Sequence, residues 1–128
     1  MRSALVGLAA LVMAAAGISP AAAQDGTESF SPAYQACITY GEAHGTTAIP
    51  ALDCSARELR RQDARLNTSY KRLMARLSPA RKTNLRIDER NWIIVRDQRC
   101  GKRRDPNDRA ECLIAETIKR VRYMERYR

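Results

Sequence analysis

The stretch LDCSARELRRQDARLNTSYKRLMARLSPA, residues 52–80, decides the fold. Four leucines in it recur every seven residues, and each is followed four residues later by a second member of the same helical face. The first row is Leu52, Leu59, Leu66 and Leu73, and the second is Ala56, Asp63, Tyr70 and Leu77. This spacing predicts an amphipathic helix that buries one seam. Asp63 is the one charged member of the seam, and a buried charge is costly unless it is paired.

Helix start and stop signals flank this seam. Ser55 and Glu58 have the spacing of a capping box, with Asp53 as an alternative cap. The helix that they begin is predicted to last to Leu77. Ser78-Pro79 then places a capping residue before a proline, which is typical of the start of a new helix.

The same signals predict three further helices and no strand. A short helix over residues 32–40 is followed by Gly41 as its C-cap, and a long one covers residues 79–100. Asp105 caps the last helix, which begins at Pro106. Long helices with short connections favour antiparallel neighbours. We therefore predict an all-α fold, a small antiparallel bundle of three main helices plus a short N-terminal helix.

The N-terminus has the pattern of a secretory signal peptide. Arg2 precedes an uncharged run over residues 4–18, and small residues end at Ala23. The run is short and rich in alanine for a membrane span, and no cysteine at its end could accept a lipid. We expect cleavage after about Ala23 and a periplasmic or secreted product that is not a lipoprotein and keeps no transmembrane anchor. A flexible segment, residues 24–31, would then precede one helical domain, residues 32–128.

All four cysteines follow the predicted signal peptide. An even number of cysteines in an exported chain predicts two disulfides. They are Cys37, Cys54, Cys100 and Cys112. Zinc is the alternative, but the chain lacks the C-x-x-C pairs typical of structural zinc sites, and its single histidine, His44, stands in a Gly-rich loop. We expect neither a metal nor a cofactor.

Three disulfide pairings are possible. Cys37 with Cys54 would tie the short first helix to the start of the second, and Cys100 with Cys112 would close the short loop between the last two helices. Crossed pairings would need helix ends to meet that the short connections keep apart. Each local disulfide should stabilise the fold by about 3 kcal/mol.

Charge is unevenly distributed along the chain. Lys and Arg number 23 and Asp and Glu 14, and removal of Arg2 with the signal peptide leaves 22 against 14, or +8. Residues 24–56 have a balance of −4, whereas residues 57–128 carry 22 bases and 10 acids, a balance of +12. A basic surface favours anionic partners such as lipopolysaccharide, acidic lipid or an acidic protein surface. Export argues against nucleic acid as a partner.

A set of spaced residues connects the second, third and fourth predicted helices. Leu66, Asn67 and Tyr70 are followed by W-x-x-x-R-D-x-x-C, which is Trp92, Arg96, Asp97 and Cys100, and then by Cys112, Thr117 and Arg120. In order and spacing this set resembles the N-terminal domain family of LprI-type lysozyme inhibitors, over about residues 37–124. The resemblance implies an exported, disulfide-bonded helical domain and, for the member that names the family, inhibition of lysozyme.

The tryptophan motif is predicted to hold the bundle together. Trp92 should lie in a seam beside Leu85 and Val95 and pack against the preceding helix. Its expected neighbours there are Leu66, Tyr70 or Leu73. Arg96 can lie against the indole and reach Asp63.

Asp97 follows Arg96 directly and is expected to pair with a nearby arginine.

Function is more plausibly carried by the loop that follows the motif. Lys102, Arg103 and Arg104 would lie in the disulfide-closed loop 101–105 and could present positive charge to the paired carboxylates of a glycosidase cleft. A solvated turn without a function is the simpler interpretation. Lysozyme or another envelope protein is the partner that this hypothesis predicts.

Two other classes of function were weighed. The last helix interleaves bases with tyrosines and could bind an anionic surface, although a core helix with a solvated basic side also explains it. Its relevant residues are Lys119, Arg120, Arg122, Tyr123, Met124, Arg126, Tyr127 and Arg128. An enzyme is poorly supported, because no base accompanies a nucleophile and His44 has no motif around it.

Overall fold

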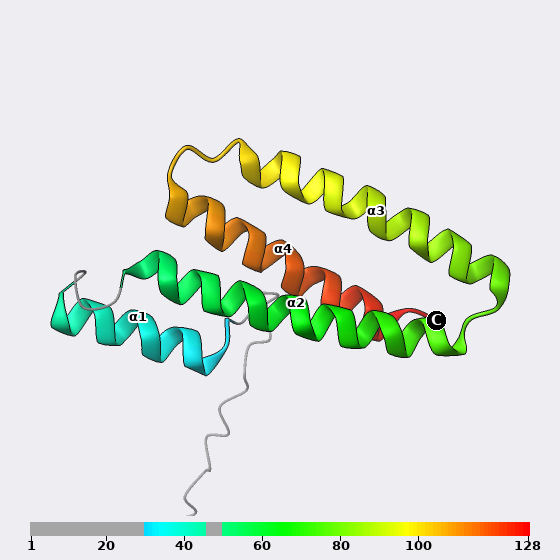
Figure 1. Cartoon of the computed structure of the whole chain (residues 1–128), viewed down its shortest axis with the longest axis horizontal. Coiled ribbons are helices and arrows are strands. Elements are labelled where there is room, and N and C mark those ends of the chain that lie inside the picture. Colours follow the sequence, from blue (N-terminus) through cyan, green and yellow to red (C-terminus); the bar gives the residue numbers. More distant parts are fainter. Residues whose placement is uncertain (1–29, 46–49) are drawn as a thin grey trace, which may run out of the picture.

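The structure is a computed structural model that describes residues 30–45 and 50–128. Four helices that alternate in direction make up this part of the chain, and it contains no strand (Figure 1). They are α1 (Pro32–His44), α2 (Ala51–Arg76), α3 (Pro79–Gly101) and α4 (Pro106–Arg126). The predicted all-α antiparallel bundle is confirmed. The predicted signal peptide, residues 1–23, and most of the segment 24–31 lie outside the described residues.

The core lies where α2 and α4 pack along one another. These two helices have the most extensive contact in the bundle, while α1 packs on α2 and α3 packs on α4. Figure 1 shows α1 beside α2 and α3 along the outer side of α4. The main apolar cluster consists of Leu66, Leu73, Leu77, Leu85, Val121 and Met124. The predicted seam is therefore right for the C-terminal half of α2.

The seam prediction is wrong for the N-terminal half of α2. Leu52 is 43% exposed, Ala56 is exposed, and Leu59 is only half-buried. The buried positions there are instead Cys54, Ser55, Glu58 and Gln62. Because the disulfide between Cys37 and Cys54 holds that side of α2 against α1, the cysteine side and not the leucine side is covered.

Two predicted helix ends are also wrong. Helix α2 begins at Ala51, so Ser55 and Glu58 lie inside it and form no capping box. Helix α1 continues past Gly41 to His44, which therefore lies on a helix rather than in a loop. Gly45 follows with a φ of 86°, a conformation that glycine adopts without strain, and this residue ends α1.

The predicted disulfide pairs are both present. Cys37 is bonded to Cys54 and Cys100 to Cys112, with Cα atoms 5.7 and 5.6 Å apart. The first disulfide joins α1 to α2, and the second joins the end of α3 to the start of α4.

Candidate functional site

The connection between α3 and α4 is a short basic loop on a fixed base. Cys100 at the end of α3 is fully buried and holds the loop to α4 through Cys112. Asp105 caps α4, its carboxylate accepting hydrogen bonds from the amides of Asn107 and Asp108 at 2.8 and 3.0 Å. The amide of Arg103 donates to the carbonyl of Cys100 at 3.0 Å, so the loop backbone is tied at both ends.

The side chains of this loop are exposed. Lys102, Arg103 and Arg104 are all open to solvent, and no ion pair is found for any of them within the described residues. The neighbouring acid, Asp105, has its carboxylate engaged in the helix cap. The loop therefore presents three adjacent positive charges on a backbone that two helices and a disulfide position.

The tryptophan motif has the predicted local geometry. The Arg96 guanidinium lies 4.9 Å from the centre of the Trp92 ring, and its Nη1 is 4.0 Å from a carboxylate oxygen of Asp63. Arg96 Nε donates to Asp97 at 2.9 Å, and its Nη1 donates to Thr117 Oγ1 at 3.3 Å. Arg96 thus links α3 to α2 and α4, and the expected partner of Asp97 is Arg96 itself.

Asp63 remains only loosely paired. Burial raises the pKa of its carboxyl, and the attraction of Arg96 opposes that rise without cancelling it. This agrees with the 4.0 Å separation, which is long for an ion pair.

A second arginine, Arg120, is central to the same region, although the sequence predicted it on the basic side of the last helix. Arg120 of α4 is 7% exposed and pairs with Asp88 and Glu89 of α3, its Nε donating to Glu89 at 2.8 Å. Its guanidinium also lies 5.4 Å from the Trp92 ring and 4.3 Å from the Tyr123 ring. Burial raises the pKa of Glu89, and the hydrogen bond from Arg120 limits that rise.

The motif residues surround an open groove between α2 and α3. Its volume is about 310 Å³, and its lining residues are Asp63, Leu66, Asn67, Tyr70, Glu89, Trp92, Ile93 and Arg96. Trp92 and Tyr70 both pack against the apolar cluster, which includes the predicted neighbours Leu66 and Leu73. Another predicted neighbour of Trp92, Val95, is 49% exposed and lies outside the core. The motif therefore fixes α3 to the bundle while one edge of it faces solvent.

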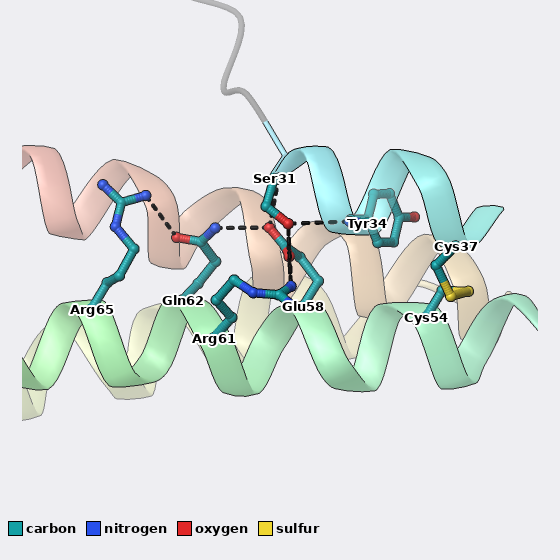
Figure 2. Close-up of polar contacts among 8 residues, drawn as sticks. All are labelled: Ser31, Tyr34, Cys37, Cys54, Glu58, Arg61, Gln62 and Arg65. Carbon is teal, nitrogen blue, oxygen red and sulfur yellow. Dashed lines mark hydrogen bonds and ion pairs between the residues drawn. A yellow bond between two sulfur atoms is a disulfide. The ribbon is translucent and has the colours of Figure 1, made fainter. Parts of the chain in front are cut away.

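A buried polar cluster at the start of α1 was missed by sequence analysis. Figure 2 shows Glu58 of α2 pointing at Ser31, the N-cap of α1. One carboxylate oxygen accepts from the Ser31 amide at 2.9 Å and from Gln62 at 2.7 Å, and the other accepts from Ser31 Oγ and Arg61, both at 2.6 Å.

These four hydrogen bonds decide the charge state of Glu58. Burial alone would raise the pKa of this fully buried carboxyl, but the hydrogen bonds from Ser31, Gln62 and Arg61 outweigh it and hold the pKa below its ordinary value. Glu58 is therefore a structural residue that caps α1 from another helix. The acid at position 58 was visible in the sequence, but its partner is 27 residues away.

The basic side of α4 is smaller than the sequence predicts. Arg120 and Met124 are buried and unavailable to an anionic surface. Five of the six remaining residues of that side, all except Arg128, line a shallow depression of about 440 Å³. They are Lys119, Arg122, Tyr123, Arg126 and Tyr127.

No three His, Cys, Asp or Glu side chains in ranges 30–45 and 50–128 are grouped so that they could hold a metal ion. His44 is exposed, stacks on Tyr40 with ring centres 4.1 Å apart, and has its Nδ1 2.9 Å from the Tyr40 carbonyl.

Within residues 30–45 and 50–128, no helix has both the length and the apolar character needed to cross a membrane.

Comparison with known proteins gives one match. The family model described as Lysozyme inhibitor LprI matches residues 39–124, which is 86 of the 128 residues. The matched range contains α2, α3, the basic loop, the tryptophan motif and most of α4. No curated protein and no solved structure matches the chain.

Proposed function

Because the chain belongs to the LprI lysozyme inhibitor family, we propose that it inhibits a lysozyme by direct protein–protein contact and catalyses no reaction itself. The basic loop, residues 101–105, is the part that enters the glycosidase cleft.

The protein acts in the periplasm or outside the cell after removal of residues 1–23, and it carries no lipid. Mass spectrometry of the exported protein, with an expected N-terminus at Gln24, tests this processing.

The observation that carries the proposal is the exposed, anchored group of three bases. Glycosidases act with two carboxylates that are roughly 5 to 9.5 Å apart in a cleft. Lys102, Arg103 and Arg104 are consecutive, so two of their cationic groups can approach two such carboxylates at once. Arginine is suited to this contact because its planar guanidinium binds a carboxylate through two hydrogen bonds. The fixed loop backbone keeps the entropy lost on binding small.

The outer side of α3 supports a protein partner beside the loop. Ile87 and Ile94 are seven residues apart and therefore lie on one side of the helix, and they are 52% and 54% exposed. Val95, next to Ile94, is also exposed. Ile94 is seven residues from Gly101, or about 10 Å along the helix axis. Apolar residues bordered by charged ones are the usual composition of a protein–protein interface.

A muramidase assay with two matched variants tests the proposal. The loop variant changes Lys102, Arg103 and Arg104 to alanine. The α2 variant changes Arg65, Arg72 and Arg76 to alanine, which removes the same formal charge from exposed positions on another helix. We expect wild-type protein and the α2 variant to inhibit alike and the loop variant to inhibit at least tenfold more weakly, a loss of about 1.4 kcal/mol.

The two parts of the proposal fail in different ways. Equal inhibition by wild type and the loop variant would show that the loop is not in the cleft. No inhibition by wild type, measured against several lysozymes, would rule out the inhibitor function as a whole. Circular dichroism and thermal melting confirm that each variant is folded.

A further inference from the structure

The exposed side of α2 carries a row of arginines. Arg61, Arg65, Arg72 and Arg76 follow one another at intervals of four, seven and four residues, which places them on one side of the helix. All four are exposed. From Arg61 to Arg76 the row spans 16 residues, or about 22 Å along the helix axis. Neither the tryptophan motif nor the basic loop includes any of these residues.

Within the described residues, acidic side chains pair with the first two of these four arginines. Residues 57–76 contain seven Lys and Arg but only two acids, the fully buried Glu58 and the half-buried Asp63 beside Arg96. The Glu58 carboxylate forms an ion pair with Arg61, with Oε2 2.6 Å from Nη1. The Glu125 carboxylate of α4 lies near Arg65, with Oε1 3.9 Å from Nη2. No ion pair is found within the described residues for Arg72 or Arg76. On α3, all three acids are paired, Asp97 with Arg96 and both Asp88 and Glu89 with Arg120 of α4.

The row borders a shallow channel between α2 and α4. Two adjoining depressions of about 250 and 410 Å³ share Ser69, Arg72 and Glu125. The arginines of the row line the α2 side from Arg61 to Arg76, and Leu73 and Met124 contribute to the lining of the smaller depression. Positive charge along a channel of this length complements an extended anion better than a small one.

From this geometry we infer that the arginine channel, defined by Arg61, Arg65, Arg72 and Arg76, binds a segment of an acidic polysaccharide. Its carboxylates pair with the guanidinium groups at intervals along the helix, and the hydroxyls of Thr68 and Ser69 lie in the same channel for contact with sugar hydroxyls. The site is independent of the proposed lysozyme contact, because Figure 1 places the α3–α4 connection and the C-terminal end of α2 at opposite ends of the bundle.

The composition of the channel favours this polymer over other polyanions. Among the described residues of α2, Leu52 is the one large apolar side chain that is exposed, so the row has no apolar group to enter a lipid surface. The channel also has no aromatic lining residue, whereas single-stranded nucleic acids are bound by stacking of bases on aromatic side chains.

Binding of alginate, a linear polysaccharide with a carboxylate on every sugar, tests the inference on the purified full-length mature protein. We expect wild-type protein to bind alginate and not neutral dextran, with an affinity that falls as salt rises. The α2 variant (Arg65, Arg72 and Arg76 to alanine) should bind at least tenfold more weakly, while the loop variant (Lys102, Arg103 and Arg104 to alanine) should bind within about twofold of wild type.

A pair of double variants makes the comparison sharper. Arg72 and Arg76 on α2, and Arg86 and Arg90 on α3, are both pairs of exposed arginines four residues apart. Alanine at the first pair should weaken alginate binding several-fold more than alanine at the second. An equal loss in both pairs would show a net-charge effect and overturn the inference. Absence of alginate binding, or tighter channel-dependent binding to anionic vesicles or single-stranded DNA, would also overturn it.

Discussion

Glu58 shows how much a single buried residue contributes to this small fold. Its carboxylate accepts four hydrogen bonds, two of them from Ser31 at the N-cap of α1. A hydrogen bond to a charged group is worth about 1.5 to 3 kcal/mol when the partner would otherwise be left unpaired. The attachment of α1 to α2 therefore depends on the charge of one side chain as well as on the disulfide nearby (Figure 2).

Replacement of Glu58 by glutamine should lower the free energy of unfolding by about 2 to 3 kcal/mol at neutral pH, because the amide removes the charge and directs an N–H group at existing donors. Asp53→Asn provides the control, since Asp53 is an exposed acid in the first turn of the same helix. Its loss should cost well under about 1 kcal/mol. Denaturant unfolding of both variants gives the values, and equal losses would contradict the role assigned to Glu58.

Acidification should remove this contribution in a defined direction. The pKa of Glu58 is lower in the folded protein than its ordinary value of 4.5, so the carboxylate stabilises the fold fully above pH 4.5. That stabilisation is lost as the pH falls through the lower, folded value. The difference in stability between wild type and Glu58→Gln should therefore shrink in strongly acidic solution, and a constant difference from pH 7 to pH 2 would contradict this assignment.

At the scale of the helices, the sequence predicts most of the fold, and the errors in the first half of α2 share one physical origin. The starts of α3 and α4, both disulfides and the C-terminal seam of α2 follow from local signals such as Ser78-Pro79 and Asp105-Pro106. Where prediction fails, at Leu52 and at the supposed capping box of Ser55 and Glu58, the outcome depends on α1. The disulfide between Cys37 and Cys54 holds α1 against α2, and α1 then covers a side of α2 that the leucine spacing predicts to be exposed.

In the candidate site, too, some contacts could be predicted from the sequence and others could not. The contact of Arg96 with Trp92 and Asp63 could be predicted because one helical turn separates Arg96 from Trp92 and because Asp63 needed a partner. The pairing of Arg120 with Glu89 could not, because it depends on how α3 and α4 are placed relative to one another. The arginine channel was not predicted, because the depression beside Arg72 and Arg76 also needs Met124 and Glu125 of α4.

The two disulfides should have different functional importance although each stabilises the fold by about 3 kcal/mol. Serine at Cys100 and Cys112 frees the base of the basic loop and should weaken lysozyme inhibition several-fold. Serine at Cys37 and Cys54 loosens α1, which packs mainly on α2 and contributes no residue to the basic loop, and should leave inhibition close to wild type. Inhibition assays on both variants, run below their melting temperatures, measure this, and equal inhibition would mean that the loop needs no fixed base.

At the scale of the whole molecule, charge opposes the proposed encounter while it favours the final contact. The full chain has a formal charge of +9, and many lysozymes are themselves basic. Long-range repulsion then slows association, although the local contact joins a basic loop to an acidic cleft. Like charges are screened by salt, and the Debye length falls from roughly 30 Å at 0.01 M to about 8 Å at 0.15 M.

Salt should therefore change the rate of association with a basic lysozyme and with an acidic lysozyme in opposite directions. With a basic lysozyme, raising the ionic strength from 0.01 to 0.15 M should increase the association rate constant, and with an acidic lysozyme it should decrease it. Surface plasmon resonance at several salt concentrations measures both rates. A decrease with both enzymes would show that the attraction of the loop, and not the net charge, controls the encounter.

The way in which α3 is attached has a consequence for the evolution of the domain. Helix α3 is held by Arg96, Arg120 and the disulfide at Cys100, all of which act from its inner side. Ile87 and Ile94 on its outer side take no part in the core. Substitutions there should cost little stability, so this side of α3 can change during evolution while the inner residues preserve the fold.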